Sequence, residues 1–160
     1  MNNFIGDTTG LVHVISAVFA LISGTMIITM KKGTKRHVQV GYLYVISMVV
    51  LIVTAFMIYR LFGGWGVFHY ASVVSLISIS LGMIPIWLKK PVNNWRYLHF
   101  TFMYWSVIGL YAAFAAEMFT RIPNTPFLGM VGIVTGVIML IGGLLFGLKK
   151  ASWRTVFEYN

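Results

Sequence analysis

Five long apolar stretches alternate with short polar segments along the chain. They run approximately over residues 10–30, 35–60, 66–88, 94–118 and 126–148. Each approaches the ~20 residues that an α-helix needs to cross the hydrocarbon core of a bilayer. Because the connecting segments are short, consecutive helices are expected to be antiparallel neighbours. The pattern predicts an all-α integral membrane protein with a single transmembrane domain over residues 1–160.

The composition agrees with a membrane location. The chain is 59% hydrophobic and 9% charged, whereas a soluble domain carries about 25% charged residues. The net charge of +9 comes from basic residues at the ends of the apolar stretches. That placement is typical of topology signals and not of a nucleic-acid-binding face. The lipid bilayer is the expected partner, and no nucleic acid is expected.

The basic residues also predict the orientation of the chain. Ten of the 12 lysine and arginine residues fall in the first loop, in the third loop and after the last apolar stretch. Arg60 and Arg121 are the two that fall on the opposite side. Because lysine and arginine favour the cytoplasmic side, the N-terminus is predicted outside and the C-terminus inside. We expect a multi-pass protein of the bacterial plasma membrane.

The fifth apolar stretch differs from the other four because its span holds no ionisable residue. It contains Gly132-x-x-x-Gly136 and Gly143-x-x-x-Gly147, a spacing that favours close helix packing. The first four helices are therefore expected to form an antiparallel four-helix bundle. The glycine-rich fifth helix is expected at its periphery, where it offers a face for a homodimer.

Four histidines lie near the starts of the first four apolar stretches. His13 and His69 belong to helices that run in one direction, and His37 and His99 to helices that run in the other. His13 and His69 are therefore expected to share the outer level, and His37 and His99 the inner level. Ionisable residues inside membrane spans usually face the bundle interior. The sequence thus predicts one histidine pair near each membrane face.

Such pairs suit two b-type haems, because two neutral imidazoles can hold haem iron. The chain has no cysteine, so thiolate metal sites are excluded. The positive end of the helix dipole favours the neutral, metal-binding imidazole at each helix start. Cationic residues are available for the haem propionates: Lys31, Lys35, Arg36 and Arg96 inside, and Arg60 and Arg121 outside.

Small residues and helical phase extend this site. The His13 face carries small residues that make room for a flat macrocycle but equally permit close helix contact: Gly10, Ser16, Ala17, Ala20 and Gly24. Residues about 18 apart lie on one face of an α-helix, which places Glu117 on the His99 face and Lys31 on the His13 face. Glu117 also lies four residues before Arg121, a spacing that favours a simple ion pair.

Several of these motifs carry a family resemblance. The segment Lys32-Gly33-Thr34-Lys35-Arg36-His37, followed later by Phe68-His69, Leu98-His99 and Arg121-Ile122-Pro123, resembles a family of small bacterial membrane proteins whose function is not established. The histidine layout is similar to the cytochrome b561 class of diheme membrane proteins. That similarity implies histidine pairs from alternate helices that bind haems near opposite faces.

Three functions follow, in order of preference. The first is a cytochrome with two bis-histidine haems, which carries electrons across the membrane from a quinol or cytoplasmic reductant to an extracellular acceptor. The second is a metal-dependent membrane enzyme in which His13, His69 and Glu117 hold zinc or non-haem iron, with Asp7 nearby as a base or ligand. The third is a non-catalytic sensor or haem-stress protein. A reduced-minus-oxidised spectrum distinguishes the three.

Overall fold

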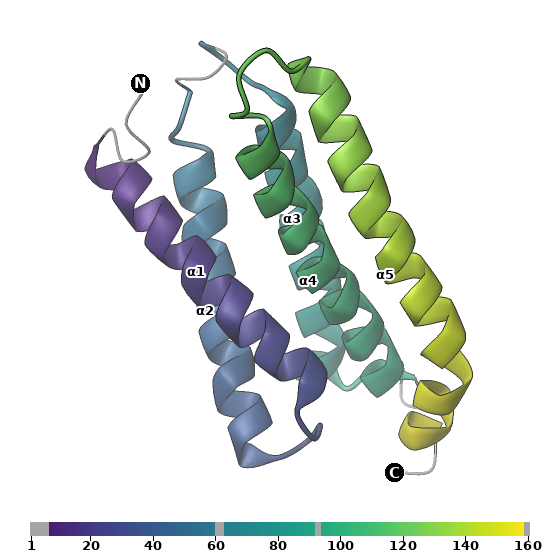
Figure 1. Cartoon of the computed structure of the whole chain (residues 1–160). Coiled ribbons are helices and arrows are strands. Elements are labelled where there is room, and N and C mark those ends of the chain that lie inside the picture. The colour runs from purple at the N-terminus through teal and green to yellow at the C-terminus, as the bar shows by residue number, and fades with distance from the viewer. Residues whose placement is uncertain (1–6, 60–62, 92–93, 159–160) are drawn as a thin grey trace. The chain divides into compact units, whose positions relative to one another are not determined.

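The computed structural model describes residues 7–59, 63–91 and 94–158, which form five α-helices and no strand (Figure 1). All five are long and apolar enough to cross a membrane, as the hydropathy pattern predicts, and the chain is a multi-pass membrane protein. The helices are α1 (Thr8–Thr29), α2 (Lys35–Ala55), α3 (Val67–Leu88), α4 (Trp95–Phe119) and α5 (Phe127–Glu158).

The starts of α1 and α2 are fixed by side-chain caps. Thr34 precedes α2, and its hydroxyl accepts a hydrogen bond from the His37 backbone N–H at 3.1 Å. Asp7 precedes α1, and its carboxylate accepts from the Gly10 N–H at 2.7 Å. Both side chains satisfy backbone donors that have no partner within the first helical turn.

Two helix ends differ from the predicted boundaries. The second helix ends at Ala55 and not near Arg60. Beyond it, the backbone hydrogen bonds join residues three apart and no longer four apart, from Met57 N–H to the Thr54 carbonyl and from Ile58 N–H to the Ala55 carbonyl. The fifth helix continues to Glu158, ten residues beyond the predicted end, because no glycine or proline stops it after Gly147. Its apolar span ends at Ala151.

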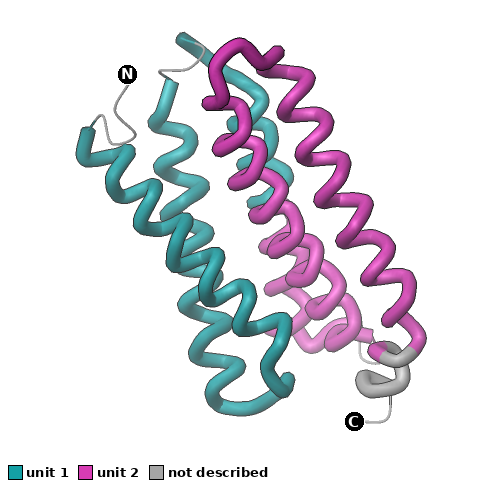
Figure 2. The backbone as a smooth tube through the Cα atoms, viewed as in Figure 1, with its two compact units in different colours: residues 1–76 teal, residues 77–160 magenta. Residues whose placement is uncertain are grey.

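The chain divides into two compact units, residues 1–76 and 77–160, and the boundary falls inside α3 (Figure 2). In unit 1, α1 packs on α2. The buried residues of α1 are mostly small, namely Gly10, Ser16, Ala20, Ser23, Gly24 and the larger Ile27. Tyr44 and Met48 are the largest fully buried side chains of α2. Most of the small residues near His13 are thus buried, and Ala17 is half-buried.

In unit 2, α4 packs on α5 through a close approach at Gly142. A Cβ atom at Gly142 would lie 2.6 Å from the Cγ2 atom of Ile108, so the glycine is required for this contact. The Tyr104 hydroxyl donates to the Gly142 carbonyl at 2.8 Å in a buried position. Added Cβ atoms at Gly132 and Gly136 would meet no atom within 4 Å. An added Cβ atom at Gly143 would lie 3.7 Å from the Trp105 ring, and one at Gly147 would meet no atom within 4 Å, so the close contact falls at Gly142 and at neither of the two predicted motifs.

Candidate functional site

His13 on α1 is half-buried and makes a hydrogen bond to α2. Its Nδ1 atom lies 2.9 Å from the hydroxyl oxygen of Thr54. That hydroxyl lies 2.8 Å from the Val50 carbonyl and 3.0 Å from the Leu51 carbonyl, both of which can only accept. The hydroxyl has a single proton, which we assign to the bond with a carbonyl oxygen. The Nδ1–H of His13 is then the donor to the Thr54 hydroxyl oxygen. Nε2 of His13 then carries the lone pair that a metal requires.

His99 on α4 has the same tautomer for a simpler reason. Its Nδ1 atom lies 2.8 Å from the Gly82 carbonyl oxygen on α3. A carbonyl oxygen accepts but does not donate, so Nδ1 carries the proton and Nε2 carries the lone pair of the neutral ring. The acceptor lies three residues before Pro85, in a turn whose hydrogen bonding the missing proline N–H disturbs. A metal-binding histidine commonly donates its second N–H to such a carbonyl.

His69 at the start of α3 has the opposite arrangement. Its Nδ1 atom accepts the Gly66 backbone N–H at 3.1 Å, three residues earlier. This contact resembles the half of a capping box in which a third-position side chain bonds back to the cap residue. A neutral imidazole has one proton, so Nε2 of His69 carries it. As it stands, this ring presents an N–H at Nε2 and no lone pair for iron.

The Nε2 atom of His69 is buried and has no hydrogen-bond partner among the described residues. The side chain is 4% exposed. A buried donor without a partner costs about 1–3 kcal/mol, and such groups are few in native proteins. The imidazole stacks on Tyr59 at a centroid distance of 4.9 Å and on Trp65 at 5.7 Å, with Phe56 at 6.1 Å.

His13 and His69 both contact the end of α2 within unit 1. His13 bonds to Thr54, and His69 packs against Phe56 and Tyr59 just beyond it. The shared outer level of these two histidines stays a prediction. His37 is half-buried in the first turn of α2 in unit 1, and His99 belongs to unit 2. Their pairing stays a prediction.

The predicted propionate partners are mostly exposed side chains at helix ends. Lys31 lies beyond the last residue of α1 and is exposed, so its predicted helical register with His13 is wrong. Lys35 and Arg36 start α2 and are exposed. The Arg96 guanidinium lies 5.0 Å from the Trp95 ring centroid. Arg60 lies outside the described residues. These positions suit contact with headgroups or propionates, which stays a prediction.

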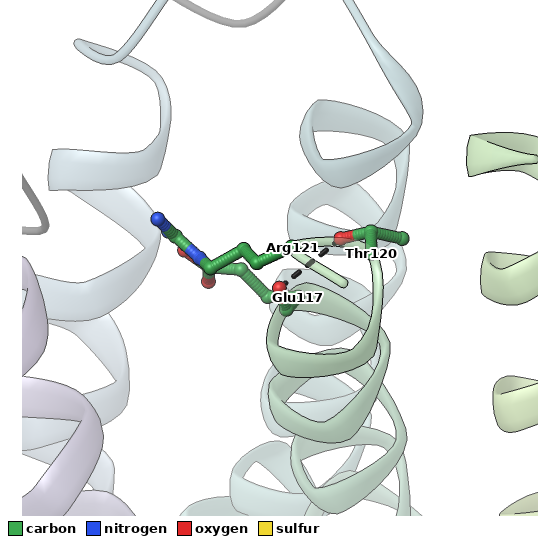
Figure 3. Close-up of polar contacts among 3 residues, drawn as sticks. All are labelled: Glu117, Thr120 and Arg121. Carbon is green, nitrogen blue, oxygen red and sulfur yellow. Dashed lines mark hydrogen bonds and ion pairs between the residues drawn. The ribbon is translucent and has the colours of Figure 1, made fainter. Parts of the chain in front are cut away.

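Glu117 and Arg121 form the ion pair that their spacing favours (Figure 3). The guanidinium Nη2 lies 2.7 Å from the carboxylate Oε1. The Glu117 backbone carbonyl also accepts from the Thr120 hydroxyl at 3.1 Å, within the last turn of α4. The carboxylate thus neutralises an arginine at the helix end, which is the simpler of its two predicted roles.

The alternative metal site gains no support from the described residues. No three histidine, cysteine, aspartate or glutamate side chains gather in the described part of the chain in a group suited to a metal ion. Asp7, the predicted base or ligand, caps α1. His13 and His69 belong to unit 1 and Glu117 to unit 2, so the three-ligand set stays a prediction.

Sequence reasoning missed the partners that fix these side chains. Thr54 and Gly82 are the acceptors for His13 and His99. The Lys32 ammonium donates to the carbonyls of Ile27, Ile28 and Met30 and thereby caps the end of α1. Lys32 follows the predicted helix end, where a cation complements the helix dipole, so the signal was present.

Comparison with protein-family models, with curated proteins and with solved structures finds no match to this chain.

Proposed function

We propose that the protein is a b-type cytochrome of the bacterial plasma membrane that passes electrons between its two faces. A quinol or a cytoplasmic reductant donates the electrons, and an extracellular acceptor receives them. The basic loops orient the protein with its N-terminus outside and its C-terminus inside. In this arrangement the first four helices form the bundle, and α5 lies at its periphery.

The hydrogen bond from His99 Nδ1–H to the Gly82 carbonyl is the observation that carries this proposal. It holds the imidazole in the tautomer that binds iron through Nε2 and restrains rotation of the ring. His13 has the same tautomer through Thr54. Partners of this kind fix ring orientation and raise the basicity of a ligating histidine. Each of these two histidines, proposed for different haems, thus carries its lone pair on Nε2, the form of the ring that binds iron.

The four histidines fit haem unequally. His99 and His37 are the proposed ligands of an inner haem, and His13 is a proposed ligand of an outer one. His69 fits the second outer position only if it releases the Gly66 N–H and transfers its proton to Nδ1. The small residues near His13 are buried in packing, which favours close helix contact there. The inner haem keeps both of its proposed ligands, whereas the outer haem needs a change at His69.

Haem supplies reversible one-electron chemistry when it is bound, and the residues of this chain position and shield it. Met103 and Tyr104 are buried on α4, one turn beyond His99. An apolar environment excludes water and tunes the potential of a haem. The exposed cations Lys35, Arg36 and Arg96 are the proposed partners of the inner propionates.

A reduced-minus-oxidised absorption spectrum of the purified full chain, expressed with adequate haem, tests the proposal. We expect a b-type spectrum and a haem-to-protein ratio of about one or two. His99→Ala should lose the inner haem, whereas Tyr97→Phe at the same end of α4 should retain it. If the chain has no Soret band, the cytochrome proposal is wrong. One zinc per chain without haem would favour the metal-dependent enzyme instead.

A further inference from the structure

The aromatic cluster around His69 contains a hydrogen-bond donor that nothing in the described structure satisfies. The Gly66 N–H occupies Nδ1 of His69 at 3.1 Å, and the proton on Nε2 is buried without an acceptor. The tautomer is fixed by a backbone donor that cannot change its role. A buried N–H of this kind points to an acceptor that is supplied from outside the chain.

The surroundings of this donor are flat and apolar. Tyr59 and Trp65 stack on the imidazole at interplanar angles of 25° and 24°, and Phe56 packs against both Trp65 and His69. The Tyr59 and Trp65 side chains are 40% and 56% exposed, so the cluster reaches the surface of the chain. Tyrosine and tryptophan at the end of a span are typical of the membrane interface. The exposed rings of the cluster therefore lie where a lipid-soluble molecule can meet them.

These features define the chemistry of a ligand. A metal ion is disfavoured because Nε2 carries a proton, and a cation is disfavoured because an N–H would face it. A planar, lipid-soluble molecule with a carbonyl oxygen satisfies the donor and stacks on the rings. We infer that Phe56, Tyr59, Trp65 and His69 bind the headgroup of a quinone, with Nε2–H of His69 donating to a quinone carbonyl.

The redox role of the quinone rests on the proposed function, but the binding of the quinone does not. The inference places a quinone-binding site at the predicted outer end of α2 and α3. It also makes His69 a binding residue for the quinone in place of a haem ligand. Haem content and quinone binding are separate measurements, so the two proposals can fail independently.

The experiment uses the full chain in nanodiscs and menadione as the quinone probe. Infrared spectroscopy of carbon-13-labelled menadione should show one carbonyl stretch lowered in frequency by a hydrogen bond. His69→Phe keeps a ring in the stack but removes the donor, so this band should disappear and affinity should fall about tenfold. Tyr70 contacts Trp65 at the edge of the cluster. Tyr70→Phe is therefore the matched control and should leave the carbonyl band and the affinity for menadione unchanged. Equal affinity and an equal carbonyl band in His69→Phe would overturn the inference.

A second measurement on the wild-type chain covers the case in which His69→Phe fails to fold. Nitrogen-15 NMR of labelled histidine should show a proton on Nε2 of His69, and its resonance should shift when menadione is added. Methylnaphthalene, which has no carbonyl, should cause no such shift. A proton on Nδ1, or an equal shift with methylnaphthalene, would contradict the inference.

Lipid esters offer the same carbonyl chemistry and are tested separately. Nanodiscs of ether-linked phospholipids, which lack ester carbonyls, should leave the Nε2–H resonance of His69 unchanged relative to ester-linked lipids before menadione is added. A resonance that depends on the ester linkage identifies a lipid as the occupant and overturns the quinone assignment.

A haem spectrum of the same sample reports on the cytochrome proposal in every case. Loss of one haem in His69→Phe would restore His69 as a ligand and overturn the inference alone.

Discussion

The Nδ1 atom of His99 lies 2.8 Å from the carbonyl oxygen of Gly82, and this hydrogen bond joins α4 to α3. The acceptor is a backbone atom, so a side-chain substitution at position 82 cannot remove it. A Cβ atom at Gly82 would lie 2.8 Å from the Met103 sulfur, which shows how closely the two helices approach. The contact therefore depends on both the glycine and the histidine.

Thr54→Val should weaken the positioning of His13. The substitution removes the hydroxyl that accepts the Nδ1–H of His13 at 2.9 Å and keeps the branched shape of the side chain. Loss of such a partner lowers metal affinity about 10- to 100-fold. In a chain that binds an outer haem, haem retention during dilution should fall, and the His13 Nδ1–H resonance should move in NMR spectra.

Thr101→Val is the control for that substitution. The Thr101 hydroxyl is buried and has no hydrogen-bond partner among the described residues, so its removal should have no unfavourable effect on stability. Equal haem retention and an unmoved His13 resonance in Thr54→Val would show that the hydroxyl does not orient the ring.

Gly142→Ala should destabilise the packing of α4 on α5. The new methyl group would lie 2.6 Å from Cγ2 of Ile108, a β-branched side chain with few alternative rotamers. Overpacking of this kind costs about 1–3 kcal/mol. The midpoint of thermal unfolding, followed by tryptophan fluorescence in detergent, should fall.

Gly136→Ala on the same helix is the control, because it replaces a glycine that makes no close contact. An added Cβ there meets nothing within 4 Å, so its unfolding midpoint should stay near that of the wild-type chain. Ile108→Ala should relieve the Gly142→Ala defect in the double variant. Equal losses at positions 136 and 142 would argue against the close contact. If Gly136→Ala changes the oligomeric state instead, the part of α5 around Gly132 and Gly136 is the homodimer face.

Asp7→Ala should destabilise the start of α1 by about 1 kcal/mol, since the Asp7 carboxylate accepts the Gly10 N–H at 2.7 Å. Asp7→Asn retains an acceptor oxygen and should retain most of that stability. Hydrogen exchange of the first-turn amides measures the difference. A stable Asp7→Asn chain that loses a metal-dependent activity would instead support the role of Asp7 as a base or ligand.

Lys32→Met should weaken the end of α1. The ammonium donates to three carbonyl oxygens at 2.6–2.9 Å, and methionine keeps an unbranched apolar stem of similar length without the donors. We expect a loss of about 0.5–1.5 kcal/mol in the free energy of unfolding, the contribution of one typical hydrogen bond. Lys31→Met removes an exposed charge from the neighbouring position and should have a smaller effect. If the two variants behave alike, the cap contributes nothing beyond charge.

The sequence alone determined the five spans, because hydropathy and segment length are local properties that the bilayer dimension translates directly into helices. It also determined the Glu117–Arg121 ion pair, whose partners lie within one helical turn. The capping contact of His69 is equally local, three residues from Gly66. A histidine at the third helical position is an unusual capping residue, and the sequence pattern favoured a metal ligand there.

The tertiary structure alone decided the tautomers of His13 and His99. Their acceptors lie 41 and 17 residues away in the chain, so no sequence pattern connects them. The packing of helices likewise decided that Gly142 is a close contact while Gly132 and Gly136 are open. Glycines of one helix have different surroundings because the atoms of the facing helix, and not the spacing of the glycines, set the available room. The proton of an imidazole is likewise placed by whichever donor or acceptor folding brings to its other nitrogen.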